Sequence, residues 1–262
     1  MKPKQFKSHA DGGSKVKKVG LARALSKLGY CSRSRALELI REGKVQLNGA
    51  IARNPESPVR IGKDRIELEG KSLEAAKKIY LVLNKPRGVV TTASDEKGRD
   101  TVYTLLPSTL PWIAAVGRLD QATEGLLLFT NDSAWAARIT DPRSHLDKTY
   151  HVQIGAIADE QLVEALQRGV QITKSELLKA KRVKVLRTGQ TNSWLEIVLD
   201  EGKNRQIRRM LEALGAEVLR LIRVSIGSLQ LGDLAKGQYR SLLAEEKIEL
   251  DRELSKGTGV ER

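Results

Sequence analysis

A charged pair, Arg118 and Asp120, lies in a short polar stretch between two apolar runs of the chain. The flanking runs, residues 112–116 and 126–130, predict two buried strands. The stretch between them is bounded by glycines and predicts a loop at a sheet edge. Charged side chains held there by two rigid strands are suited to catalysis. The alternative is a structural turn in which the local backbone and the neighbouring arginine satisfy the aspartate.

Few other residues can carry chemistry. The sequence has no dinucleotide-binding glycine pattern, no phosphate-binding loop and no zinc-hydrolase motif. Its three histidines and one cysteine are too few for an ordinary zinc site, so no metal is expected. The remaining candidates are Asp120, Tyr150 and the basic cluster at 203–209. Lys85 and Arg87 follow another predicted strand, 79–84. One carboxylate kept ionised by an arginine would suit an enzyme that acts on RNA.

The charge of the chain favours an anionic partner. The 262 residues carry 46 basic and 32 acidic side chains, a net charge of +14. Eleven of these charges lie in the first 78 residues, which predicts a separate basic module that binds nucleic acid. The single cysteine suits a reducing compartment. No apolar run is long enough to span a bilayer and no leader-like start is seen, so we expect a cytoplasmic protein without a membrane partner.

The elements that must position these residues divide the chain into five parts. We expect a flexible basic tail over 1–18, a helix–helix–hairpin module over 19–70, a linker over 71–78, a catalytic domain over 79–245 and a charged tail over 246–262. Local signals for the module and the catalytic domain include Ser32, Asp132 and Asn204 as helix caps and Asn48-Gly49 as a hairpin turn. Strands alternating irregularly with few helices indicate the α+β class, with a mixed, mostly antiparallel sheet and flanking helices.

The front module resembles the S-four-type RNA-binding domain. The resemblance rests on two short helices, the Ser-Arg-Ser-Arg start of the second helix and the VQLNG hairpin. In that family a basic helix face contacts the shape and backbone of RNA. The resemblance implies this role for Arg33, Arg35, Arg41 and Lys44. A solvated face without a ligand is the alternative.

The catalytic domain resembles bacterial ribosomal RNA pseudouridine synthases. The GRLD motif at 117–120 is followed by Thr123 and by GLLLFTND at 125–132. Segments KPRG, KTY, EGKNRQIRRM and LIRVSIG agree in order and extend the match over nearly all of 79–245. Among the branches of the family the chain is most similar to the RluB and RluE kind, with the RsuA kind next.

The resemblance implies a role for each matched residue. Asp120 is the nucleophile, Arg208 is the arginine that keeps it ionised, and Tyr150 stacks on the uracil. Substrate binding is assigned to Arg118, which fills the gap left by the displaced base, and to Leu221, Lys85, Arg87, Lys203 and Arg205. The reaction detaches the base of a uridine from its ribose and reattaches it through carbon 5, so no cofactor is needed.

The expected partner is ribosomal RNA or a pre-ribosomal particle, and the protein is expected to be a monomer. Large-subunit RNA is favoured over small-subunit RNA. A non-catalytic RNA-binding factor of ribosome assembly is the main alternative, and a base methyltransferase with a similar front module is a third. Because extruding a base costs a few kcal/mol, the target uridine should lie in a loop or a distorted helix.

Overall fold

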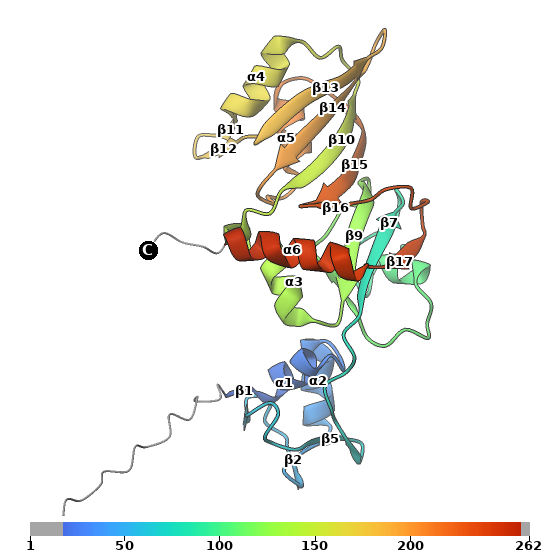
Figure 1. Ribbon diagram of the computed structural model, residues 1–262, viewed down its shortest axis with the longest axis vertical. Coiled ribbons are helices and arrows are strands. Elements are labelled where there is room, and N and C mark those ends of the chain that lie inside the picture. Colours follow the sequence, from blue (N-terminus) through green and yellow to red (C-terminus); the bar gives the residue numbers. More distant parts are fainter. Residues whose placement is uncertain (1–17, 258–262) are drawn as a thin grey trace, which may run out of the picture. The chain divides into compact units, whose positions relative to one another are not determined.

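The computed structural model describes residues 18–257, which form two compact units that divide between residues 75 and 76 (Figure 1). The predicted basic tail falls outside the described residues, apart from Lys18. No helix in the part of the chain that the structure describes is long and apolar enough to cross a membrane.

Two helices form the core of the first unit. Helix α1 (Leu21–Leu28) ends at Gly29, whose φ of 86° is the left-handed conformation that glycine adopts readily. Helix α2 (Arg33–Arg41) begins after Ser32, whose side chain accepts a hydrogen bond from the backbone N–H of Arg35, as predicted. The apolar faces of the two helices meet in a buried cluster that includes Leu21, Leu25, Ala36, Ile40 and Val45.

Short strands complete this unit. Strands β2 (Val45–Leu47) and β3 (Ala50–Ile51) form the predicted hairpin, with positive φ angles of 53° at Asn48 and 84° at Gly49. The other strands are β1 (Val19–Gly20), β4 (Pro58–Val59), β5 (Ile66–Leu68) and β6 (Lys71–Ser72). Because β6 pairs with β5, residues 71–72 belong to this small sheet, and the prediction that they are linker is wrong.

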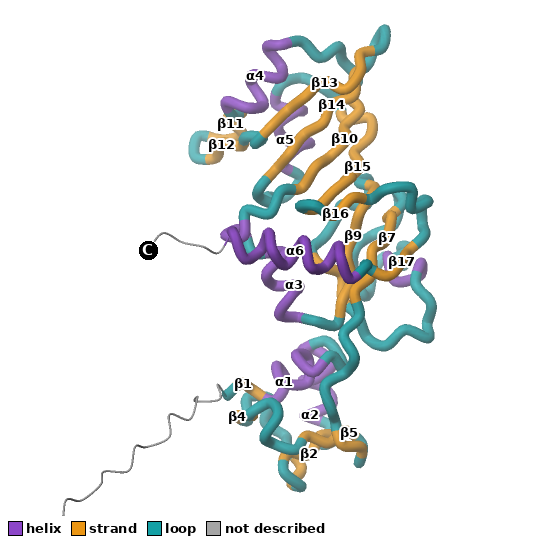
Figure 2. Tube along the Cα trace, in the orientation of Figure 1, coloured by secondary structure: helices purple, strands orange, loops and turns teal. Residues whose placement is uncertain are grey.

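The second unit is built on a nine-stranded sheet, which confirms the predicted α+β class. Its main path runs β13-β14-β10-β15-β9-β7-β17, with β8 beside β9 and β16 beside β15; Figure 2 shows the strands in orange. All the pairs are antiparallel except β15 with β9. The strands are β7 (Tyr80–Lys85), β8 (Ala114–Val116), β9 (Glu124–Thr130), β10 (Lys148–Ile154), β13 (Arg182–Thr188), β14 (Ser193–Leu199), β15 (Val218–Ile226), β16 (Leu229–Gln230) and β17 (Tyr239–Ser241).

The parallel contact between β9 and β15 depends on one glycine. Gly125 has a φ of 103°, and a Cβ atom there would clash with the backbone carbonyl of Arg223. Only glycine therefore allows β9 to lie this close to β15. This contact joins the strand that follows Asp120 to the strand that borders β10, which carries Tyr150.

Helices cover the sheet in two places. Helices α4 (Glu160–Arg168) and α5 (Gln206–Ala213) contribute Leu166, Ile207, Met210 and Leu211 to a core on β10, β14 and β15. Helix α3 (Ser133–Thr140), capped as predicted by Asp132, packs elsewhere, against β8 and β9. The remaining elements are the 3₁₀ turns η1 (Val102–Leu105) and η2 (Pro142–Ser144) and the hairpin of β11 (Val170–Thr173) and β12 (Glu176–Leu178).

Two local predictions need correction. Residues after Glu245 are not a charged tail, because helix α6 (Ala244–Gly257) buries Leu250 and Leu254 against a core that contains Trp135. Asn204 is not the cap of α5: the cap position is Arg205, which has a φ of 47° and makes no side-chain capping hydrogen bond. The helix therefore begins with a backbone conformation that non-glycine residues rarely adopt, and this residue borders the pocket described next.

Candidate active site

A buried lysine binds the backbone of the loop that carries Asp120. Lys85, the last residue of β7, is fully buried, and its ammonium donates to the backbone oxygens of Pro86, Asp120, Gln121 and Thr123 at 2.8 to 3.4 Å. Burial lowers the pKa of Lys85 to about 8, although Asp120 and Glu124 act in the opposite direction. The prediction that Lys85 contacts RNA is therefore wrong: a side chain without solvent exposure cannot bind a phosphate of the substrate.

A buried carboxylate with ionic partners fixes the end of the same loop. The carboxylate of Glu124, the first residue of β9, is almost wholly buried. It accepts two hydrogen bonds from Arg220, at 2.8 and 3.0 Å, and one ion pair from Lys236 at 2.7 Å. Two charge-assisted contacts on one buried carboxylate give the start of β9 a fixed place. The loop is thus anchored by Lys85 at its centre and by Glu124 at its end.

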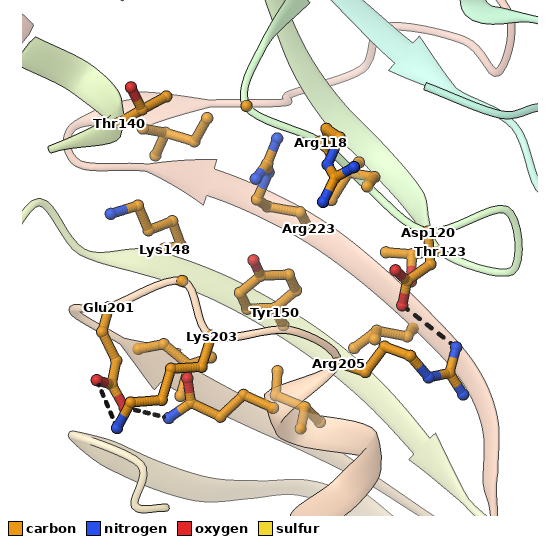
Figure 3. Close-up of a pocket in the computed structure, with 18 of the residues that line it drawn as sticks. Arg118, Asp120, Thr123, Thr140, Lys148, Tyr150, Glu201, Lys203, Arg205 and Arg223 are labelled. Carbon is orange, nitrogen blue, oxygen red and sulfur yellow. Dashed lines mark hydrogen bonds and ion pairs between the residues drawn. The ribbon is translucent and has the colours of Figure 1, made fainter. Parts of the chain in front are cut away.

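The direct partner of Asp120 is Arg205. The guanidinium Nη1 lies 3.4 Å from the carboxylate Oδ2, and Figure 3 marks this contact. Arg208, predicted as the partner, instead donates from Nη2 to the backbone oxygen of Ala122 at 3.1 Å. Burial lowers the pKa of the Arg208 guanidinium, Arg205 adds to that effect, and Asp120 opposes it. Arg208 therefore supports the loop backbone and acts on Asp120 only through the electrostatic field.

Asp120 and Tyr150 line the same pocket, of about 430 Å³. This volume lies within the range of pockets that bind small ligands. Tyr150 comes from β10, and Figure 3 shows its ring in the middle of the cavity, with Asp120 at one side. The structure also places four of the other predicted site residues in the lining: Arg118, Lys203, Arg205 and Leu221.

Two further cations in the lining were missed by the sequence reasoning. Arg223 is 6% exposed and donates from Nε to the backbone oxygen of Leu126 at 2.8 Å. Its Nη2 has no hydrogen-bond partner among the described residues. Burial and the neighbouring Arg223 lower the pKa of Lys148. Arg223 and Lys148 make this part of the lining positive, which suits an oxygen-rich or anionic ligand. Alternation along a strand was the only signal that would have pointed to Arg223.

The other predicted site residues lie outside the pocket lining. Arg87 is exposed, with Nη1 at 3.5 Å from the backbone oxygen of Leu219. In the first unit Arg33, Arg35, Arg41 and Lys44 are all exposed. Two of them are paired with carboxylates, Arg35 with Glu38 and Lys44 with Glu42, each at 2.8 Å. Exposed pairs of this kind are weak, so these cations stay available to a phosphate.

A pocket in which Asp120 and Glu201 lie among several cations, together with a basic helical module, points to the class of RNA-modifying enzymes. Comparison with known proteins gives the family. The model of the family described as RNA pseudouridylate synthase matches residues 79–213, and that of the S4 domain matches residues 19–66. The chain belongs to the RNA pseudouridine synthases, which are isomerases, and is of the RsuA and RluB type.

Individual relatives agree with this assignment. The chain is 38% identical to the ribosomal large subunit pseudouridine synthase B of Bacillus subtilis, over 86% of this chain and 93% of that protein. It is 34% identical to an uncharacterised RNA pseudouridine synthase of Aquifex aeolicus, over 88% and 93%. A crystal structure of a pseudouridylate synthase superposes with a TM-score of 0.63 at 32% identity, over 88% of this chain and 99% of that one.

Proposed function

We propose that this protein converts a uridine of large-subunit ribosomal RNA to pseudouridine, with Asp120 as the nucleophile and without a cofactor. The C1′–N1 bond of the nucleotide breaks, the base turns, and a bond forms from C1′ to carbon 5. The proton on carbon 5 is lost and N1 gains one, so nothing is oxidised or reduced. The observation that carries the proposal is the meeting of Asp120, Arg205 and Tyr150 at one pocket.

The proposal gives a role to several side chains of the pocket and to two that lie behind it. Arg205 keeps the Asp120 carboxylate in place, and Tyr150 stacks on the flipped uracil and receives the proton from carbon 5. Arg118 fills the space that the base leaves in the RNA, and Leu221 packs beneath the base. Arg223 lines the pocket and places its positive charge beside the bound nucleotide. Arg208 and Lys85 hold the loop backbone and do not touch the substrate.

The choice of substrate rests on two supports. The Bacillus subtilis relative is named for the large ribosomal subunit, and the alignment spans most of both chains. The first unit exposes Arg33, Arg35, Arg41 and Lys44, which would bind the backbone of the same RNA, with Lys203 and Arg87 contacting it nearer the pocket. In this proposal the protein acts as a monomer in the cytoplasm, and the domain that performs the reaction begins at residue 79 and includes helix α6, which extends to Gly257.

Mapping of pseudouridine tests the proposal. Ribosomal RNA from a strain that lacks the protein is incubated with the purified chain, and carbodiimide-dependent stops of reverse transcription locate modified positions. We expect one or few new stops in large-subunit RNA, and none with Asp120→Asn. Stops confined to small-subunit RNA would move the substrate there. RNA binding without any stop would indicate a non-catalytic factor of ribosome assembly. A requirement for a methyl donor would indicate a methyltransferase.

A further inference from the structure

The sheet of the second unit has a basic outer face, which the reaction does not use. In an antiparallel sheet, directly paired residues share a face. The registers place Arg187, Trp194, Gln153 and Arg220 in one row across β13, β14, β10 and β15, and Lys184, Glu196, His151 and Ile222 in the next. The inner rows contain Val152, Leu195 and Leu221, which belong to the core covered by α4 and α5. Pocket residues Tyr150 and Leu221 thus lie on the opposite face.

Positive charge dominates these outer rows. We define the outer basic face as Arg182, Lys184, Arg187, Trp194 and Arg220. Arg182 is 64% exposed in its side chain, and Lys184 and Arg187 are exposed. On β13, β14, β10 and β15 these rows hold one carboxylate, Glu196, which is paired with Arg182 at 3.1 Å. On β9, Glu124 continues the second row and compensates the charge of Arg220. Within residues 18–257 neither Lys184 nor Arg187 forms an ion pair, so their charges are uncompensated locally.

An indole ring organises the arginines of this face. The guanidinium carbons of Arg187 and Arg220 lie 5.3 and 5.9 Å from the ring centre of Trp194, within the range of a cation–π contact. Arg220 is also held by its two hydrogen bonds to Glu124. Trp194 therefore restrains Arg187 against a fixed neighbour, which lowers the entropy that this side chain loses when it binds an anion.

Protection of a sheet edge is a simpler explanation for part of this charge. Strand β13 is the edge of the sheet, and lysine or arginine on edge strands prevents pairing with other chains. That explanation covers Arg182, Lys184 and Arg187. It does not cover Trp194 and Arg220, which lie on interior strands β14 and β15 and extend the same surface inward.

We propose that the outer basic face is a second RNA-binding surface, which holds the phosphate backbone of RNA that continues beyond the target stem. Guanidinium groups bind phosphate oxygens in a bidentate manner, and a lysine adds a point charge. Residues 179–187 carry five basic side chains and no acidic one, in keeping with a partner that is a polyanion. Because the chain belongs to a family of RNA-modifying enzymes, the polyanion in this proposal is RNA. The pocket contacts the target, and this face contacts a flanking segment.

A matched pair of variants of the full chain tests this proposal. Lys184→Gln with Arg187→Gln removes two charges from the face. The control, Arg168→Gln with Lys174→Gln, removes one arginine and one lysine from exposed positions on α4 and the β11–β12 turn. Binding is measured by fluorescence anisotropy between 50 and 300 mM salt. The probes are a domain-sized fragment of large-subunit ribosomal RNA and a stem-loop of about 20 nucleotides cut from it.

For the long RNA we expect the face variant to bind about tenfold more weakly than the control near 100 mM salt. The slope of log affinity against log salt should fall by about 1 to 2, as for the loss of one or two phosphate contacts. Affinity for the stem-loop should equal that of the control. Equal affinities and slopes for both variants on the long RNA would overturn the proposal. Aggregation of the face variant with unchanged affinity of its monomeric fraction would also overturn it, in favour of edge protection.

Cross-linking of the unaltered protein gives a second readout that does not depend on a variant folding. The long RNA is transcribed with 4-thiouridine, irradiated with the protein, digested and analysed by mass spectrometry. We expect cross-linked peptides from residues 182–194 with the long RNA and none with the stem-loop. Absence of such peptides, with cross-links found in the pocket, would contradict the proposal. Both measurements report binding, so they stand even if no uridine is converted.

Discussion

Arg205 and Asp120 form an ion pair of 3.4 Å at the rim of the pocket, and Arg205 adopts a left-handed backbone conformation there. The side chains are 48% and 33% exposed, so the pair contributes little to folding. Its position at the start of α5 instead suits orientation of the Asp120 carboxylate in the pocket. Removal of this contact should therefore change the activity strongly and the free energy of unfolding only slightly.

We expect Arg205→Gln to lower kcat/KM about 10- to 100-fold, because the carboxylate of Asp120 loses its direct partner. Its free energy of unfolding should change by less than about 1 kcal/mol. Single-turnover conversion of the mapped RNA and urea unfolding measure the two effects. Arg168→Gln, an exposed arginine that is paired with Glu164 and lies outside the pocket lining, is the control. Full activity of Arg205→Gln would show that Asp120 needs no such partner.

Arg223 should matter through its geometry as well as its charge. Arg223→Lys keeps the charge but lacks the planar guanidinium that binds the backbone oxygen of Leu126 through Nε while the side chain lines the pocket. We expect kcat/KM to fall about 10- to 100-fold, since the positive charge no longer holds the same place in the lining. RNA affinity at the first unit should be unchanged. A variant as active as the original would mean that the position of this charge in the lining does not matter for the reaction.

The pH dependence of stability should reveal the buried ammonium of Lys85. The pKa of this group is about 8 in the folded chain, below the ordinary value of 10.5. Between these two pH values the unfolded chain binds the proton more strongly, so stability gains a contribution as the pH rises. Relative to Lys85→Met, which has no group to titrate, the unfolding free energy of the unaltered protein should rise from pH 8 to 10. A constant or falling difference would contradict the burial of the charged form.

Helix α6 should be required for the stability of the second unit. Leu254 is 1% exposed and packs in the cluster that contains Trp135 and Leu250, so Leu254→Ala should lower the free energy of unfolding by about 2–4 kcal/mol. Exposed Ile248→Ala is the control and should cost under about 1 kcal/mol. Equal effects of the two substitutions on urea unfolding would contradict the packing of α6 against the core.

The features that could be predicted from the sequence were mainly helix caps and turns, which short-range contacts determine. Ser32 and Asp132 cap helices, and Asn48-Gly49 turns a hairpin, because each acts on backbone within three residues. That Asp120 and Tyr150 line the same pocket was predicted only from the resemblance to a family.

The errors arose where tertiary contacts decide. Nothing local shows that the charge of Lys85 is buried under a loop 35 residues further on. The two buried leucines of α6 stand among charged residues, so their four-residue spacing was the sole sign of a packed helix. The preference of Asp120 for Arg205 over Arg208 depends on the left-handed start of α5, a conformation that the identity of an arginine does not indicate.

The anchorage of the Asp120 loop by Lys85 has a consequence for how such enzymes can change. The ammonium binds main-chain oxygens, which every amino acid supplies, and it binds none of the loop's side chains. Ala122 offers only its backbone oxygen to Arg208, so this position can drift in sequence, or be randomised in a library, while Asp120 keeps its place. Gln121 is more constrained, because its side chain donates to the backbone oxygen of Gly88 at 2.9 Å.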